Sequence, residues 1–338
     1  MIGYDRSEGG MKVNDRAVSL LEQYELTVNR TWKGRGAILC DTDQGLKIFM
    51  EYPCAREKII LQDTLLNHIK EAGGVRTEGI VRNKEGELLV VDTDQTAYVL
   101  KDYFEGQECN VRDLKDCKKA VEKLAVLHRV MYLPAYVAQN DTSVFSLTGE
   151  MEKRTRELKK VYKFLRGKSQ RGDFELFLLH HYTPFFEKAR QVSAELQSED
   201  TQKEQEFIRK MGSLCHGDYQ YHNVLFRESG EAVIHFERCI VDSQMRDLCL
   251  FLRKVLEKNN WDRKTAEVLL EAYDREKSLT EADRRQLYYR FAYPEKFWKI
   301  VNFYYNNGKA WIPEKNMEKL TKLLEQEEER EVFLKSLR

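Results

Sequence analysis

The residues best suited to chemistry lie in one short stretch, where His216, Gly217 and Asp218 follow an apolar segment and Asn223 comes five residues after the Asp. A carboxylate and a carboxamide at opposite ends of a tight loop are what phosphoryl transfer needs. Asp218 can accept the proton of an attacking hydroxyl, and the amide oxygen of Asn223 can bind a magnesium ion. The plain alternative for an isolated His-Gly-Asp triplet is a simple turn, because Gly and Asp are both turn formers.

The surrounding pattern predicts an α+β protein with two lobes. Residues 1–104 predict a small antiparallel β lobe with a helix at 55–72, and residues 105–338 predict a mostly helical lobe that contains the His-Gly-Asp loop. Strands are expected at 26–28, 37–42, 46–50, 87–91, 97–104 and 232–237; helices are expected at about 15–24, 149–166, 173–197, 243–259, 263–275, 280–291, 294–307 and 313–336. Composition predicts an irregular, loosely packed N-terminal segment at residues 1–14 and an exposed polar linker at 198–206.

Composition narrows the class of protein. The 338 residues contain 56 Lys and Arg and 56 Asp and Glu, so no net charge attracts nucleic acid or an anionic membrane. No apolar run approaches the roughly 20 residues of a membrane span, and the polar N-terminus lacks the apolar core of a signal peptide. The seven cysteines are scattered, which favours free thiols in a reducing compartment. We expect a cytosolic protein that binds neither nucleic acid nor membrane.

A glycine pair, Gly34 and Gly36, separates the first two predicted strands. Backbone amides of such a turn could approach a phosphate group. Glycine in a hairpin turn is also commonplace, and we weight the plain turn about two to one over a phosphate cradle.

The layout and motifs resemble a known superfamily. His216-Gly217-Asp218 with Asn223, together with Leu124-Ala125-x-Leu127-His128 upstream, resembles the aminoglycoside phosphotransferase and choline kinase superfamily, which has a protein-kinase-like fold. Further stretches are similar to CotS-type spore coat proteins: 103–107, 236–239, 246–248, 251–254, Trp261 and the tail 293–305. This resemblance runs from about residue 16 to the end. Its tail signature is more specific than the His-Gly-Asp motif.

The resemblance implies roles for individual residues. Asp218 would be the catalytic carboxylate, His216 would brace its loop, and Asn223 would bind the metal. Lys47, in the third predicted strand, would reach the phosphates of ATP, and Asp247 would fix the loop from behind.

The resemblance also implies that ATP and Mg²⁺ are needed if the protein is active. In addition, an acidic residue of the 55–72 helix would pair with Lys47. Glu57, Gln62 and Asp63 are the residues offered there, and the sequence does not choose among them.

One position departs from the active pattern. Active relatives carry a metal-binding Asp on the strand after the loop, where this chain has Ile234-His235-Phe236. Neutral imidazole is a poor magnesium ligand, so a deficit of several kcal/mol in transition-state stabilisation is expected. Glu237, two residues along the same predicted strand, could partly substitute, and Asp242 is a more distant candidate.

Two hypotheses of function remain. The first is a degenerate small-molecule kinase that serves the spore coat as a structural or binding component, with or without retained nucleotide binding. Its partners would be other spore coat proteins, and it would be made in the mother-cell cytoplasm and deposited in the coat. The second is an active ATP-dependent phosphotransferase acting on a hydroxyl of a sugar, an amino alcohol or an aminoglycoside-like compound. His235 favours the first hypothesis, and the intact Asp218, Asn223 and Lys47 favour the second.

Overall fold

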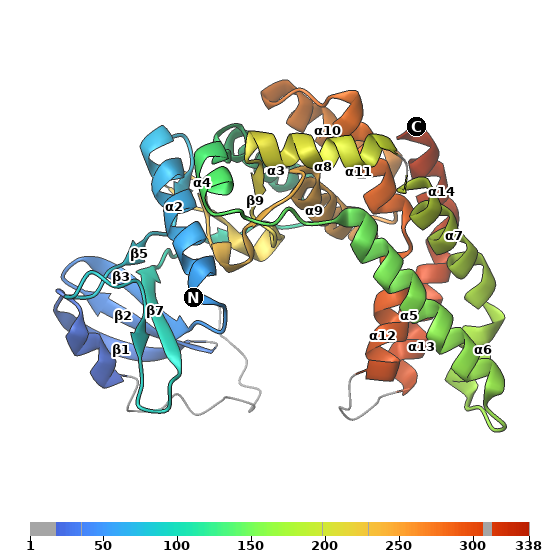
Figure 1. Cartoon of the computed structure of the whole chain (residues 1–338), viewed down its shortest axis with the longest axis horizontal. Coiled ribbons are helices and arrows are strands. Elements are labelled where there is room, and N and C mark those ends of the chain that lie inside the picture. The colour runs from blue at the N-terminus through green and yellow to red at the C-terminus, as the bar shows by residue number, and fades with distance from the viewer. Residues whose placement is uncertain (1–17, 35, 198, 229, 307–312, 338) are drawn as a thin grey trace. The chain divides into compact units, whose positions relative to one another are not determined.

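The computed structural model describes residues 18–34, 36–197, 199–228, 230–306 and 313–337 (Figure 1). The chain divides into two compact units. Unit 1 comprises Met1–Cys109 and His222–Cys239, and unit 2 comprises Asn110–Tyr221 and Ile240–Arg338. The sequence analysis predicts a single boundary between residues 104 and 105, which would assign 222–239 to the helical lobe. The structure instead assigns this segment to unit 1. The predicted loose start lies outside the described residues, as does the beginning of the helix expected at 15–24.

Unit 1 is built on a twisted antiparallel sheet. Its strands are β1 (Val28–Gly34), β2 (Ala37–Thr42), β3 (Gly45–Glu51), β5 (Ile80–Val81), β6 (Val90–Val91) and β7 (Ala97–Asp102). They are ordered β1-β2-β3-β7-β5, with β6 also paired to β7. Gly36 (φ +69°) lies in the turn before β2, and Gly45 (φ +84°) is the first residue of β3; both have backbone conformations that favour glycine. The expected meander of strands joined by glycine turns is confirmed, although the first strand spans Val28–Gly34 and not 26–28.

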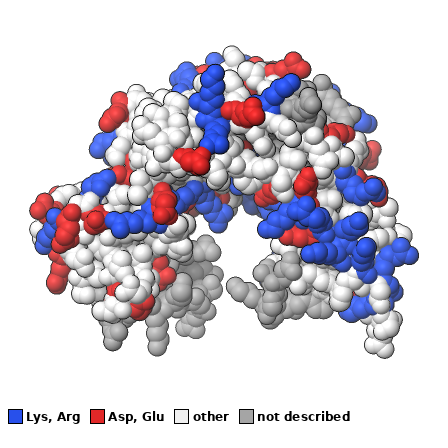
Figure 2. Space-filling view, in the orientation of Figure 1, with Lys and Arg blue, Asp and Glu red and all other residues white. Residues whose placement is uncertain are grey.

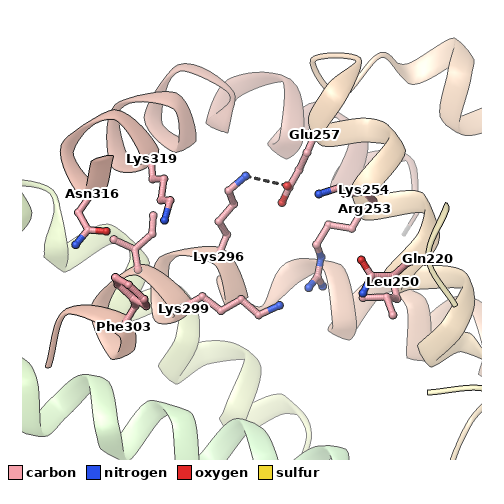
Figure 3. Close-up of a pocket in the computed structure, with 11 residues that line it drawn as sticks. Gln220, Leu250, Arg253, Lys254, Glu257, Lys296, Lys299, Phe303, Asn316 and Lys319 are labelled. Atoms are coloured by element: carbon pink, nitrogen blue, oxygen red, sulfur yellow. Dashed lines mark hydrogen bonds and ion pairs between the residues drawn. The ribbon is translucent and has the colours of Figure 1, made fainter. Parts of the chain in front are cut away.

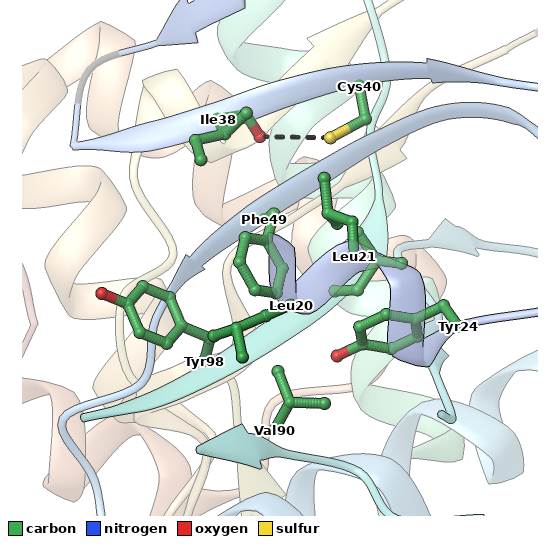
Figure 4. Packing of buried hydrophobic residues seen from close by; sticks show 9 residues of the cluster. Leu20, Leu21, Tyr24, Ile38, Cys40, Phe49, Val90 and Tyr98 are labelled. Carbon is green, nitrogen blue, oxygen red and sulfur yellow. Dashed lines mark hydrogen bonds between the residues drawn. The ribbon is translucent and has the colours of Figure 1, made fainter. Parts of the chain in front are cut away.

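The two faces of this sheet bury different partners. On one face, Phe49 of β3 packs with Leu20, Leu21 and Tyr24, in and beside the short 3-10 helix η1 (Leu20–Gln23) (Figure 4). On the other face, cluster members include Val99 of β7 and Ile59 of helix α2 (Arg56–Ala72), with Met50 of β3 packed against them. Because side chains alternate along a strand, this division fixes the face of every residue in β3 and β7.

A second sheet in unit 1 gathers strands from distant parts of the chain. Its order is β4 (Arg76–Thr77), β11 (Ala232–Val233), β10 (Val224–Phe226) and β8 (Gln107–Glu108). β11 pairs with β4 in parallel and with β10 in antiparallel orientation. This pairing ties 222–239 to unit 1, although the 112 residues of Asn110–Tyr221, which belong to unit 2, precede that segment in the sequence.

Unit 2 is mostly helical. Its helices are α3 (Leu114–Val130), α4 (Pro134–Gln139), α5 (Leu147–Gly167), α6 (Asp173–His180), α7 (Tyr182–Glu195), α8 (Glu199–Met211), α9 (Met245–Lys258), α10 (Arg263–Glu276), α11 (Glu281–Ala292), α12 (Glu295–Asn306), α13 (Pro313–Glu325) and α14 (Glu327–Ser336). Two short strands, β9 (Leu214–Cys215) and β12 (Ile240–Val241), pair antiparallel. The α+β class, with an antiparallel first part and a helical second part, is confirmed.

Three local expectations for unit 2 need correction. The polar segment 198–206 is not a link, because α8 begins at Glu199. Its Glu, Gln and Lys residues are good helix formers, so polarity alone misled the prediction. The helices expected at 173–197 and 313–336 are each interrupted once, at His181 and Gln326.

Two aromatic residues near the C-terminal end, Tyr293 and Phe297, pack into the helical core. Phe297 is fully buried and stacks on Phe185 with ring centroids 4.5 Å apart, and Tyr293 is 1% exposed. The cysteines are free thiols, of which Cys54 alone is exposed. Among the described residues, no helix is long and apolar enough to cross a bilayer.

Candidate functional site: a braced catalytic-type loop and a buried lysine between carboxylates

The His-Gly-Asp loop of unit 2 is held in place from behind by Asp247. This residue lies in the first turn of α9 and is fully buried. Its two carboxylate oxygens accept hydrogen bonds from the backbone N–H groups of His216 (2.5 Å) and Gly217 (2.8 Å). Gly217 has φ +80°, which lets the backbone turn so that both amides face one carboxylate.

A buried histidine completes the support of Asp247. His128 Nε2 donates to Asp247 Oδ2 at 3.2 Å, and Tyr273 Oη lies 2.8 Å from the other ring nitrogen. Burial lowers the pKa of His128, so its ring stays neutral, with Nδ1 accepting from the tyrosine hydroxyl. Burial alone would raise the pKa of Asp247, but the hydrogen bond from His128 and the backbone amide of Gly217 hold it below its ordinary value. Asp247 is therefore an anion that orders the loop.

Asp218 itself is presented at the end of this braced turn. Its backbone N–H donates to His216 Nδ1 at 3.1 Å, and its Oδ1 accepts from Gln220 Nε2 at 2.6 Å. The next residue, Tyr219, is fully buried and donates its hydroxyl proton to the carbonyl of Ala120 at 2.7 Å. The carboxylate of Asp218 is half-buried, as suits a group that must exchange a proton with a bound molecule.

Asn223 and Asp218 fall in different units, so each is described in its own surroundings. In unit 1, Asn223 ends the 3-10 turn η2 (Tyr221–Asn223) and is 1% exposed. Its carbonyl accepts from the N–H of Ile234 at 3.1 Å, which joins it to the segment that carries His235.

His235 does not lie on a strand. β11 ends at Val233, and His235 has φ +69° and ψ +57°, a left-handed conformation that starts the 3-10 turn η3 (Phe236–Arg238). The expectation of a strand at 232–237, with Glu237 on the same face by alternation, is therefore wrong. The two side chains still meet, since His235 Nδ1 is 3.7 Å from Glu237 Oε2. A turn, rather than a pleat, brings them together.

Lys47 and Lys101 point to opposite faces of the main sheet. Lys47 is opposite Asp102 in the β3–β7 register, and Ile48 is opposite Lys101. Met50 and Val99, the next pair on the face of Ile48 and Lys101, pack toward α2. Lys47 thus shares the other face with Phe49.

The pairing of Lys47 follows from this geometry. Its Nζ donates to Asp102 Oδ1 at 2.7 Å and to the carbonyl of Gln44 at 2.9 Å. In α2, Asp63 pairs with Arg82 at 2.5 Å. The prediction that Lys47 pairs with an acidic residue of the 55–72 helix is therefore wrong within the described structure, because Lys47 faces away from that helix.

The lysine on the α2 face is Lys101, which the sequence reading missed. It is fully buried in β7, and its Nζ lies 3.1 Å from both carboxylate oxygens of Glu78, a residue that is 2% exposed. The same ammonium contacts Glu237 Oε1. Glu78 also accepts from the backbone N–H of Phe236 at 3.0 Å, so β7, η3 and the segment after β4 are joined at one point. The available signal was a lysine amid Tyr98, Val99 and Leu100, in a strand buried on both faces.

Electrostatic interactions favour the charged forms of Lys101 and Glu237. Burial alone would lower the pKa of Lys101, but Glu78 and Glu237 raise it above its ordinary value. Burial likewise opposes ionisation of Glu237, yet His235 and Lys101 hold the pKa of this carboxyl well below its usual range. A buried cation is thus matched to two carboxylates.

Among the described residues, three members of this cluster form a group that could hold a metal ion. Glu78, His235 and Glu237 each offer one ligand atom, all within 4.8 Å of one another. The ammonium of Lys101 already contacts both carboxylates, and the third ligand is an imidazole. Mg²⁺ prefers an all-oxygen octahedron, so these donors fit it poorly while Lys101 is present.

Three other predicted residues, Asp242, Gly34 and Gly36, have ordinary structural surroundings. Asp242, the distant substitute for the missing carboxylate, pairs in unit 2 with Arg290 at 2.8 Å and Arg246 at 3.3 Å and is 2% exposed. Gly34 ends β1 opposite Ala37, and Gly36 occupies the tight turn between them. The turn explains both glycines, and a phosphate-binding role for them stays a prediction.

The fold is that of known small-molecule kinases. An aminoglycoside phosphotransferase from Alicyclobacillus acidocaldarius superposes with a TM-score of 0.82 at 20% identity, covering 98% of this chain and 97% of that one. A spectinomycin phosphotransferase, solved in complex with ADP and spectinomycin, gives 0.61 at 14% identity over 92% of each chain. A choline kinase from Cryptosporidium parvum gives 0.53 at 13% identity, covering 93% of this chain and 94% of that chain. At these identities the likeness establishes the fold, and the predicted kinase-like fold is confirmed.

Sequence comparison identifies the family. Spore coat protein S of Bacillus subtilis (strain 168) is 25% identical over 309 residues, which cover 90% of this chain and 87% of that protein. The predicted resemblance to CotS-type proteins is thereby confirmed. A family model described as "Spore coat putative kinase YutH" matches residues 17–337, nearly the whole chain. The protein therefore belongs to this spore coat family, which has a kinase-like fold.

Proposed function

We propose that the protein is a spore coat component in which the kinase fold has lost efficient phosphoryl transfer. The observation that carries this proposal is the position of Lys101. Its ammonium lies between Glu78 and Glu237. These two carboxylates and His235 are the three residues that could together hold a metal ion. The ammonium of Lys101 thus neutralises the negative charge of these carboxylates, as a bound divalent ion would.

The energetic argument supports the same proposal. For a metal to use Glu78 and Glu237, the buried ammonium of Lys101 would have to leave, and breaking a buried ion pair costs about 3–5 kcal/mol. His235 supplies an imidazole nitrogen, which hard cations such as Mg²⁺ accept poorly. Both terms weaken the electrostatic stabilisation on which phosphoryl transfer depends.

The role in the coat is proposed from the relatives. Membership of a spore coat family, and the likeness to spore coat protein S, support deposition in the coat and contacts with other coat proteins. Such a role requires a stable fold and a binding surface, and it does not require turnover.

A second candidate function is supported by the catalytic-type loop. Asp247 and His128 hold the loop in a single arrangement, and Asp218 is presented half-buried at its end. In an active enzyme, Asp218 would take the proton of an acceptor hydroxyl, and Asn223 would help to hold Mg²⁺ on ATP. The phosphoryl acceptor would be a hydroxyl-bearing small molecule.

Calorimetry with the full-length protein separates the two candidates. ATP is titrated with and without Mg²⁺, and ATP turnover is then measured beside the Asp218→Asn variant. For the degenerate kinase we expect no gain in ATP affinity from Mg²⁺ and no turnover above that of the variant. Micromolar, Mg²⁺-dependent binding with turnover abolished by Asp218→Asn would establish the enzyme instead.

A further inference from the structure

Unit 2 contains a cavity of about 360 Å³ beside the catalytic-type loop (Figure 3). Three helices line it, and each does so with residues one helical turn apart. α9 contributes Arg253, Lys254 and Glu257, and α12 contributes Lys296 and Lys299. α13 contributes Asn316 and Lys319. The volume lies within the range typical of small-molecule sites.

The charge of this lining is strongly one-sided. Five of its side chains are cationic, and Glu257 is the single carboxylate among the lining residues. Glu257 pairs with Lys296 at 2.8 Å. Outside the lining, Glu295 pairs with Arg253 and lies 2.7 Å from Lys299. Two carboxylates therefore face five cations.

Lys254 and Lys319 are the two cations of the lining that are not paired with a carboxylate of the described chain. Within the described part of the chain, neither has a carboxylate oxygen within 4.0 Å. Lys254 Nζ lies 5.8 Å from the ring centroid of Tyr221, and Lys319 Nζ lies 5.2 Å from that of Phe303. Both ammonium groups remain able to bind an added anion, at opposite sides of the cavity as Figure 3 shows.

A buried amide points to a ligand independently of charge. Asn316 of α13 lines the cavity and is 1% exposed. Its Nδ2 has no hydrogen-bond partner among the described residues. A buried donor without an acceptor costs about 1–3 kcal/mol, and a ligand oxygen would remove that cost.

The cavity also adjoins the reacting end of the loop. Gln220 lines it and donates from Nε2 to Asp218 Oδ1 at 2.6 Å. A molecule in the cavity thus lies one side chain away from Asp218. The surface of unit 2 reinforces the positive potential, since Figure 2 shows Lys and Arg side chains gathered along α5, which packs on α12 through Arg154 and Trp298.

We propose that this cavity binds a small anionic molecule, specifically one that carries a phosphate ester. Lysine ammonium groups bind phosphate oxygens as point charges, and Asn316 supplies a neutral donor. This names the ligand class for the acceptor side of the proposed kinase-like site. It differs from a cationic aminoglycoside or an amino alcohol, which five cations would repel.

The test uses the full chain without nucleotide and without divalent metal. Inorganic pyrophosphate, glucose 6-phosphate, glucose and spectinomycin are titrated in turn by calorimetry. We expect the two phosphate compounds to bind, more weakly as salt increases, while glucose and the cationic spectinomycin do not bind. Because ATP and Mg²⁺ are absent, failure here leaves the proposal about phosphoryl transfer untouched, and the reverse also holds.

Paired substitutions locate the binding. Lys254→Gln with Lys319→Gln should weaken pyrophosphate binding roughly tenfold or more, as expected for charged hydrogen bonds removed from a site. The matched control is Lys258→Gln with Lys315→Gln, which removes exposed lysines of the same two helices that do not line the cavity. An equal loss in both pairs would overturn the proposal, as would tighter binding of spectinomycin or no binding of either phosphate compound.

Discussion

Replacing Lys101 with methionine should destabilise unit 1 and at the same time create a metal site. The substitution keeps the apolar stem and removes an ammonium that contacts Glu78 at 3.1 Å and also reaches Glu237. Two carboxylates, one of them 2% exposed, would be left facing each other without a cation. Removing one partner of a buried ion pair costs about 3–5 kcal/mol, a large part of the roughly 5–15 kcal/mol that stabilises a typical domain.

Metal should then restore part of what Lys101→Met removes. With the ammonium gone, Glu78, His235 and Glu237 can share an ion, and Mn²⁺ accepts both carboxylate and imidazole ligands. At a hundredfold excess over its dissociation constant, bound Mn²⁺ would return about 2.7 kcal/mol. The wild-type protein should gain nothing at the same concentration, because Lys101 already contacts both carboxylates.

Hydrogen exchange of the β3 and β7 amides is the suitable assay, because it reports on unit 1 separately from the helices of unit 2. Exchange is compared at pH 7 with and without Mn²⁺ in wild type, Lys101→Met and Lys70→Met, the last removing an exposed lysine of α2. The deficit of Lys101→Met should narrow in acid, where the unpaired carboxylates take up protons. Unchanged protection in Lys101→Met, or equal protection by Mn²⁺ in wild type, would refute the reasoning.

Three further outcomes are expected. Asp247→Asn should lower the free energy of unfolding by about 1.5–3 kcal/mol, because the new side-chain NH₂ group would face a backbone N–H and one hydrogen bond would be lost. The pKa of Asp247 is depressed in the folded protein, so its contribution should disappear as pH falls below about 4, where denaturation of wild type and variant should converge. His235→Asp should raise Mg²⁺-dependent ATP affinity in calorimetry, and unchanged affinity would place the lesion elsewhere. Burial and neighbouring Arg253 lower the pKa of Lys299 to about 8, so pyrophosphate binding should weaken between pH 7 and 9, and Lys299→Gln should flatten that dependence.

The sequence predicted the elements whose signal is local. The His216-Gly217-Asp218 loop needs only a turn between short strands, and its spacing to Asn223 is visible in the chain. The helices of unit 2 follow from apolar periodicity. The strand predicted at 232–237 was wrong because it depended on the backbone conformation of one residue. His235 adopts a left-handed conformation, so a turn follows the strand and side chains do not alternate there.

The buried ion cluster was beyond reach for a different reason. Glu78, Lys101 and Glu237 are separated by 23 and 136 residues, and no spacing rule connects them. The strand register decides which lysine faces α2, and a shift of one residue exchanges the faces. Lys47 was a reasonable choice by position along the chain, yet pairing with Asp102 places it on the opposite side of the sheet.

The interleaved composition of the two units bears on how the chain can be made and divided. A ribosome delivers β4 and β8 long before β10 and β11, so the second sheet of unit 1 cannot close until the chain has passed Val233. Unit 2 is similarly incomplete until its second segment, which starts at Ile240, has emerged. Neither unit can be cut out as one continuous fragment, and a truncation after residue 104 would leave sheet edges exposed to self-association.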